Sequence, residues 1–195
     1  MNDHNYYQNN EDLKSEPKTF KVTVDGLDFT IKTDNGVFAK SGVDYATEIL
    51  LKNAEISQNS CILDVGCGYG IIGVFMAKKY GCKVEMIDVN PRAINLAKDN
   101  LELNNLSGDV YLSDCFENVK NKYDFIISNP PIRAGKKVIY RIYEEAKDHL
   151  NPGGAFYIVI QKKHGAPSTI EKLESIYENV EIIYKKKGFF VIKSY

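Results

Sequence analysis

Segments with the patterns of strands and of helices alternate along the chain from residue 61 to its end, and this alternation limits the fold more than any other feature. Five apolar runs have the pattern of strands, in the order CILDV, KVEMID, DVYLS, DFIIS and AFYIVI. Helical spacing of apolar residues occurs between most of them, and Asn90 and Pro91 are suited to the start of one such helix. Strands that alternate with helices predict a parallel sheet covered by helices on both faces.

Antiparallel strands are expected at both ends of this pattern. The last two apolar runs, VEIIY and FFVIK, are joined by the short loop 185–188, which predicts a hairpin. Near the N-terminus, KTFKVTVDGLDFTIKT alternates around Asp25 and Gly26, which is also typical of a hairpin, and a helix follows it. We therefore predict an α/β fold. It is a Rossmann-like, doubly wound, seven-stranded and mostly parallel sheet with a C-terminal antiparallel hairpin, preceded by an N-terminal β-hairpin.

One domain is expected to account for most of the chain, because 195 residues can bury a substantial core without disulfides or metals. We expect residues 1–17 to form a flexible segment and residues 18–195 to form a single domain. Within it, residues 18–55 hold the hairpin and its helix, and residues 56–195 hold the ligand-binding core.

Composition narrows the class of protein further. The net charge of −1 argues against a generally basic, non-specific nucleic-acid binder, although a local basic face remains compatible with it. The four cysteines form no C-x-x-C pair and three lie in or beside apolar runs, so we expect buried thiols and no metal site. The N-terminus is polar, and the longest apolar run, residues 71–77, is too short to span a bilayer, so we expect a cytoplasmic protein.

The segment LDVGCGYGIIG follows the first strand of the alternating region and has two interpretations. Gly68, Gly70 and Gly73 satisfy the G-x-G-x-x-G pattern, and Asp88 follows Gly68 by 20 residues at the end of the second strand. This is the spacing of a dinucleotide fingerprint, so an oxidoreductase that uses a nicotinamide or flavin cofactor is a real alternative.

Asp64 favours a different cofactor. A carboxylate inside a buried strand is costly unless a cation or hydrogen-bond donors meet it, and a dinucleotide pyrophosphate is itself anionic. S-adenosylmethionine (SAM) carries a sulfonium and an ammonium group, so an acid beside a glycine loop suits it. Asp88 can accept from the ribose hydroxyls and Asp114, after the third strand, from the adenine amino group, although an aspartate at such positions also caps helices or starts turns. We predict cofactor contacts from Asp64, Gly66, Cys67, Gly68, Gly70, Asp88, Val89, Asp114, Cys115 and Asn129.

The motif DVGCGYG, the acid at the end of the second strand and NPPI at the end of the fourth together resemble class I SAM-dependent methyltransferases. More narrowly, the chain resembles the "small domain" group, which includes the small-subunit (16S) rRNA guanine-N2 methyltransferases. Further similarities are GVFAKSGVDYAT at residues 36–47, HLNPGG at 149–154 and KKHGA at 162–166, so the resemblance covers nearly the whole chain. It implies a SAM-dependent methyltransferase that acts on an exocyclic amino group of RNA, with guanine-N2 of 16S rRNA as the expected target.

Asn129, Pro130, Pro131 and Ile132 are the predicted catalytic residues. An exocyclic amine is a weak nucleophile, and two acceptors aimed at its N–H bonds can orient it. The side-chain carbonyl of Asn129 and the backbone carbonyl of Pro130 are suited to this, because the fixed φ of proline holds that carbonyl rigidly. The alternative is that the prolines only end a strand.

Ile132 departs from the commoner pattern, in which an aromatic residue follows N-P-P and stacks on the base. Phe38 is a candidate for the missing aromatic wall. The departure weakens two alternatives within this class, an adenine-N6 target and a protein-glutamine target, for which an aromatic is usual.

Basic residues follow the fourth and fifth strands and fill the last loop. If the last strand is antiparallel, all three groups emerge at the catalytic edge and form a phosphate-binding rim. Singly, each is as well explained by solvated surface. We predict RNA contacts from Arg133, Lys136, Lys137, Lys162 and Lys163, with further basic residues at Arg141 and 185–187. The expected partner is rRNA or an assembling small ribosomal subunit.

Overall fold

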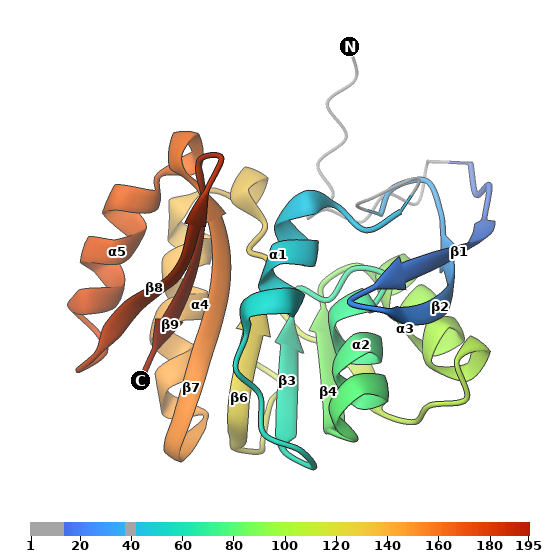
Figure 1. The fold of residues 1–195 in the computed structure, drawn as a ribbon, viewed down its shortest axis with the longest axis horizontal. Coiled ribbons are helices and arrows are strands. Elements are labelled where there is room, and N and C mark those ends of the chain that lie inside the picture. Colours follow the sequence, from blue (N-terminus) through green and yellow to red (C-terminus); the bar gives the residue numbers. More distant parts are fainter. Residues whose placement is uncertain (1–13, 38–41) are drawn as a thin grey trace.

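The computed structural model describes residues 14–37 and 42–195, which form a two-stranded sheet and a seven-stranded sheet (Figure 1). The small sheet is the antiparallel hairpin of β1 (Lys18–Val24) and β2 (Leu27–Thr33). The large sheet has the strand order β5-β4-β3-β6-β7-β9-β8. Its strands are β3 (Cys61–Val65), β4 (Lys83–Asp88), β5 (Asp109–Leu112), β6 (Tyr123–Ser128), β7 (Leu150–Gln161), β8 (Val180–Lys186) and β9 (Phe189–Ser194).

The predicted fold class is confirmed. The strands β3 to β7 pair in parallel, and β9 pairs antiparallel with β7 on one side and β8 on the other. The turn between β8 and β9 is shorter than the predicted loop, since Lys185 and Lys186 still belong to β8. Lys187 and Gly188 make the turn with φ of 51° and 77°, the left-handed backbone that a tight two-residue hairpin requires.

Helices cover both faces of the large sheet. The helices are α1 (Tyr45–Asn53), α2 (Ile71–Tyr80), α3 (Pro91–Leu103), α4 (Lys136–Asp148) and α5 (Ala166–Glu174), with short 3₁₀ turns η1 (Ile132–Ala134) and η2 (Lys162–His164). Alternate residues of a strand point to opposite faces, so Ile62 joins the core under α1, α2 and α3, whereas Leu63 joins the core under α4 and α5. Within the described ranges, none of the helices is both long and apolar enough to cross a membrane.

The N-terminal hairpin is attached to α3 through two asparagines. Asn100 and Asn104 use their side-chain amides to replace a strand partner for β2. Asn100 Oδ1 accepts from the N–H of Lys32 at 2.7 Å, and Asn104 Oδ1 accepts from that of Thr30 at 3.1 Å. These bonds hold the hairpin against α3, and through α3 against the large sheet.

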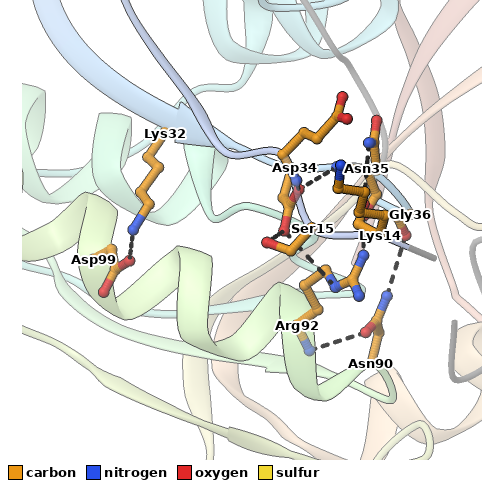
Figure 2. A network of polar contacts seen from close by, with 10 residues as sticks. Lys14, Ser15, Lys32, Asp34, Asn35, Gly36, Asn90, Arg92 and Asp99 are labelled. Carbon is orange, nitrogen blue, oxygen red and sulfur yellow. Dashed lines mark hydrogen bonds and ion pairs between the residues drawn. The ribbon is translucent and has the colours of Figure 1, made fainter. Parts of the chain in front are cut away.

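A polar network ties the chain before β1 to the start of α3 (Figure 2). The buried carboxylate of Asp34 accepts from Ser15 Oγ at 2.7 Å and from the N–H of Glu16 at 2.6 Å. Burial alone would raise the pKa of Asp34, but these bonds and the charge of Arg92 hold it below its ordinary value. Arg92 also donates to the carbonyl of Asn35 at 2.6 Å. Residues 14–17 of the predicted flexible segment are therefore attached, and residues 1–13 lie outside the described residues.

The start of α3 confirms a local prediction. Asn90 caps this helix by accepting from the N–H of Arg92 at 3.0 Å, and Pro91 occupies the first turn. The capped start of α3 follows the end of β4 at the carboxyl edge of the sheet, where β3, β4 and β6 end below α1 and β7 extends beside it (Figure 1). Ligands of open α/β sheets bind at this carboxyl edge.

Candidate active site

A cavity of about 620 Å³ lies at the carboxyl edge of the sheet. The ends of β3, β4 and β7 line it, together with the residues directly after β6, the start of α1 and the first residue of β9. It is large enough for a nucleoside-sized ligand and a second group beside it. The predicted glycine loop and the predicted N-P-P motif both lie in its wall.

The glycine loop divides into residues that face the cavity and residues that pack behind it. Gly66, Cys67 and Gly68 line the cavity, and the backbone there is fixed because the N–H groups of Gly66 and Cys67 both donate to the carbonyl of Ile87. Gly70 is outside the lining. Its φ is 84°, and an added Cβ would lie 2.8 Å from Cβ of Ala97, so Gly70 allows α2 and α3 to approach closely. Burial raises the pKa of the Cys67 thiol well above its ordinary value.

Asp88 lines the cavity at the end of β4, with Val89 beside it. Its Oδ2 accepts from the N–H of Gly68 at 2.9 Å and its Oδ1 from the N–H of Asn90 at 2.9 Å. Burial raises the pKa of Asp88, although these N–H groups act against the shift. The side chain therefore connects the glycine loop to the start of α3 and remains at the cavity wall.

Asp64 is completely buried inside β3 and does not belong to the described cavity lining. Its Oδ2 accepts from the N–H of Gly73 at 3.1 Å, whereas its Oδ1 has no hydrogen-bond partner in the described part of the chain. Burial raises the pKa of Asp64 to about 7, and the charge of Asp88 adds to the shift. An unpartnered carboxylate oxygen behind the glycine loop is a place where a nearby cation stabilises the ionised form.

The segment after β5 contributes less than predicted. Ser113 and Cys115 line the cavity, but the side chain of Asp114 between them is half-exposed and outside the lining formed by the described residues. Asp114 Oδ1 lies 3.3 Å from Nη1 of Arg141. Arg141 also pairs with Glu145 at 2.7 Å, so it neutralises acidic side chains and does not add to the predicted basic rim.

The N-P-P motif lies in the cavity wall beside the glycine loop, since a Cβ added at Gly66 would lie 3.9 Å from Cδ of Pro131. Asn129, Pro130, Pro131 and Ile132 all line the cavity directly after β6. The preceding Ser128 donates to the carbonyl of Val65 at 2.7 Å, which fixes the end of β6 beside the end of β3. Because β3 and β6 pair in parallel, the glycine loop and the N-P-P motif follow neighbouring strand ends.

The predicted RNA-binding residues surround this cavity unevenly. Arg133 lines it, and the exposed Lys136 and Lys137 begin α4 just beyond. Lys162 and Lys163 are exposed in η2, and the N–H of Lys162 donates to the carbonyl of Gly188 in the last turn. The three basic segments therefore do share the carboxyl edge. Phe38 lies outside the described residues.

Several lining residues were not predicted from the sequence. Asp44, Tyr45 and Thr47 come from the start of α1, and Phe189 comes from the start of β9. The rings of Tyr45 and Phe189 meet edge to face with centroids 5.2 Å apart. The motif GVFAKSGVDYAT contained the first three, but its pattern indicated a helix and did not indicate a wall of the site.

The fold and the site together define a Rossmann-like methyltransferase. Residues 28–193 match the family model described as methyltransferase small domain, so the chain belongs to that family. The two interpretations of the glycine loop are thereby decided in favour of a methyltransferase. Proteins of this family use SAM, so the cofactor prediction is confirmed at the level of the family.

Three relatives describe where the chain stands within the family. YbxB of Bacillus subtilis is 44% identical over 199 residues, which covers 100% of this chain and 98% of YbxB. The ribosomal RNA small subunit methyltransferase C of Colwellia psychrerythraea is 32% identical over 186 residues, covering 91% of this chain and 50% of that protein. The T. thermophilus 16S rRNA N2 guanine methyltransferase, solved in complex with AdoMet and guanosine, superposes with a TM-score of 0.85 at 25% identity. That match covers 93% of this chain and 51% of the neighbour, so the chain spans about half the length of these named methyltransferases.

Proposed function

We propose that this protein transfers a methyl group from SAM to an exocyclic amino group of RNA, and that the target is guanine-N2 of 16S rRNA. The observation that carries the proposal is the position of Asn129 and Pro130 in the wall of the same cavity as the glycine loop and Asp88. A methyl donor and an amine would meet there, at the carboxyl edge where two neighbouring strands end.

The residues present fit SAM. The buried Asp64 has one carboxylate oxygen without a partner in the described structure, which suits a cationic ligand in front of the glycine loop. Asp88 lines the cavity at the end of β4, and its carboxylate would accept from the ribose hydroxyls. Gly66 and Gly68 have φ of 69° and 56°, so the loop brings its backbone, free of side chains at these positions, against the ligand. When bound, the cofactor supplies the electrophilic methyl group.

Asn129 and Pro130 would act on the incoming amine. The lone pair of a planar exocyclic amine is delocalised into the ring, so the amine must be held in line and allowed to become pyramidal. The side-chain carbonyl of Asn129 and the backbone carbonyl of Pro130 would accept its two N–H groups and favour that geometry. Pro131 has φ of −74° and restricts the conformation of Pro130, so the carbonyl is already oriented before the substrate binds.

Tyr45 and Phe189 would supply the aromatic face that Ile132 lacks. Both lie in the cavity lining together with Ile132, and their rings are already packed against each other. A base held by Asn129 could stack on one of these rings, because any base has a π-face that an aromatic side chain can cover. Phe38, the aromatic residue predicted from the sequence, stays a candidate for the same role.

Guanine is favoured over the alternatives by the chemistry named for the neighbours. The T. thermophilus neighbour was solved with guanosine, and the Colwellia relative is named as a small-subunit rRNA methyltransferase. An adenine-N6 target or a protein glutamine would use the same pair of acceptors and is the second candidate. The basic segments at the carboxyl edge favour a polyanion, since eight of the nine predicted Lys and Arg side chains remain after Arg141 is excluded.

The test is methyl transfer by the purified chain from radiolabelled SAM to naked 16S rRNA and to isolated small subunits of a strain that lacks the protein. Label recovered as N2-methylguanosine supports the proposal, and Asn129→Ala is expected to lower kcat by about 100-fold or more, a larger effect than its effect on the binding of S-adenosylhomocysteine. If label is found only on adenine or only on protein, that group is the target and guanine is not. We further propose that the assembled small subunit is the preferred substrate, and equal activity on naked rRNA would contradict that preference.

A further inference from the structure

The side chain of Asn129 is held by a chain of hydrogen bonds that begins at the first turn of α1. Asn129 Nδ2 donates to Thr47 Oγ1 at 3.0 Å. Thr47 Oγ1 in turn donates to Asp44 Oδ2 at 2.6 Å. All three residues line the cavity, and Thr47, which joins the two bonds, is only 3% exposed.

The direction of these bonds is determined by Asp44. An ionised carboxylate only accepts hydrogen bonds, and a threonine hydroxyl has a single hydrogen to donate. Because that hydrogen points at Asp44, Thr47 Oγ1 presents lone pairs to Asn129 and must receive a donor there. The amide of Asn129 therefore turns its NH₂ group toward Thr47 and leaves its carbonyl oxygen for the cavity.

The opposite orientation of the Asn129 amide is disfavoured for two reasons. It would place Asn129 Oδ1 against Thr47 Oγ1 with no hydrogen between the two oxygens. It would also turn the NH₂ group toward a substrate amine whose N–H bonds need acceptors.

We propose that Asp44 and Thr47 are positioning residues that fix the acceptor orientation of Asn129 for an amine substrate. This inference rests on the proposed function, because it assigns the polarity that a substrate amine requires. Asp44 serves the fold at the same time: its Oδ1 accepts from the N–H of Thr47 at 3.1 Å and caps α1. One carboxylate thus starts the helix and orients the reacting amide.

The first measurement is kinetic. Thr47→Val keeps the shape of the side chain but removes the hydroxyl, and it is expected to lower kcat by about 10- to 100-fold, as for other small losses of alignment. The KM for RNA and the affinity for S-adenosylhomocysteine should change by less than about 3-fold, since only the orientation of a reacting group is lost. Thr47→Ser keeps the hydroxyl and should restore most of kcat. Asp44→Asn still caps α1 but no longer dictates where the hydroxyl hydrogen points, so an intermediate fall in kcat is expected.

The matched control is Thr169→Val. Thr169 is also buried, at 3% exposed, but it lies in α5 outside the cavity lining, so this variant loses a buried hydroxyl without touching Asn129. It should keep the kcat of the original chain even if its Tm falls.

The second measurement does not depend on activity. In ¹⁵N-labelled protein the side-chain NH₂ signals of Asn129 are identified by their loss in Asn129→Asp. Thr47→Val should move them toward the positions of a solvent-exposed amide, whereas Thr47→Ser and Thr169→Val should leave them in place. If Thr47→Val keeps both kcat and these NH₂ signals unchanged, the positioning role is wrong although the methyltransferase stands. If the unmodified chain transfers no methyl group at all, the proposed function fails, and the NH₂ signals still report whether Thr47 holds Asn129.

Discussion

Replacing Asp64 by asparagine is expected to stabilise the cofactor-free protein increasingly as the pH rises from 5 to 8. Asp64 is 0% exposed and one of its two oxygens has no partner among the described residues. Its remaining contact, from the N–H of Gly73 to Oδ2, is one that an asparagine carbonyl can keep. The substitution therefore removes a buried charge while it preserves the local hydrogen bond.

The magnitude follows from the pKa. Burial raises the pKa of Asp64 to about 7 from its ordinary value of 3.8. A carboxyl group with a raised pKa contributes its full stability below the unfolded value and loses that contribution as the pH rises through the folded value. Between pH 5 and pH 7 the loss is about 1.4 kcal/mol per pH unit, or about 3 kcal/mol in total. Asparagine does not titrate, so any constant cost of its amide cancels when the two pH values are compared.

The assay is thermal unfolding of the original chain and of Asp64→Asn at pH 5 and at pH 8. For a chain of 195 residues, 1 kcal/mol moves Tm by about 2–4 °C, so the Tm difference should shift by roughly 6 to 12 °C in favour of the variant at pH 8. S-adenosylhomocysteine should raise the Tm of the original chain more than that of the variant, because the variant lacks the buried negative charge behind the glycine loop that would stabilise a cationic ligand in front of it.

A Tm difference that is equal at both pH values would refute this reasoning, since it would show that Asp64 does not titrate in this range. Asp124→Asn is the matched control on β6. Both oxygens of Asp124 have partners, the N–H of Cys61 at 2.8 Å and Asn151 Nδ2 at 2.9 Å. This variant is expected to lose stability at both pH values, because an amide cannot accept both bonds.

Three further predictions concern packing, the N-terminal network and the substrate. Gly73→Ala is expected to lower the free energy of unfolding by about 1–3 kcal/mol, because its Cβ would lie 2.4 Å from Sδ of Met86. Urea titration measures this free energy. In a chain that already carries Met86→Val, Gly73→Ala should cost less, because the shorter side chain leaves room for the added Cβ. Asp34→Ala should cost about 1–3 kcal/mol at pH 7. This cost should fall in acid. The pKa of Asp34 is lower in the folded chain than in the unfolded chain, so its ionised form stabilises the fold at higher pH and that contribution is lost as the pH falls. A cost that is independent of pH would contradict this. Phe189→Ala should weaken RNA binding by about 10-fold and leave the affinity for S-adenosylhomocysteine unchanged, as measured by fluorescence anisotropy and calorimetry; equal losses of both would show that Phe189 supports the whole cavity.

The sheet could be predicted because each strand and its turn carry a local signal. Alternation of apolar residues identified the N-terminal hairpin, and Asn90 with Pro91 announced the start of α3. The last loop was predicted two residues too long, because Lys185 and Lys186 have little intrinsic preference for strands and are held in β8 by pairing with β9. Where the partner of a residue lies within a few positions, the sequence is enough to place it.

Charged side chains were harder to place, because their partners come from distant elements. The sequence assigned Asp114 to the cofactor and Arg141 to the RNA-binding rim. In the structure they pair with each other, Asp114 from the segment after β5 and Arg141 from α4. Neither residue type indicates such a contact, since acids and bases at the surface pair in many geometries for similar small energies. Only the packing of α4 against the sheet brings these two together.

Asn129 shows what the two approaches contribute separately. The motif N-P-P on a strand end predicts an acceptor pair, because two prolines fix a backbone carbonyl beside an amide. It does not say which end of the amide faces the substrate, and the chemistry of an amine depends on that. The answer comes from Thr47, which is 82 positions away and reaches Asn129 only because α1 lies across the carboxyl edge of the sheet. A strand-end motif can therefore name the reacting group, while the helix that covers it decides the polarity of that group.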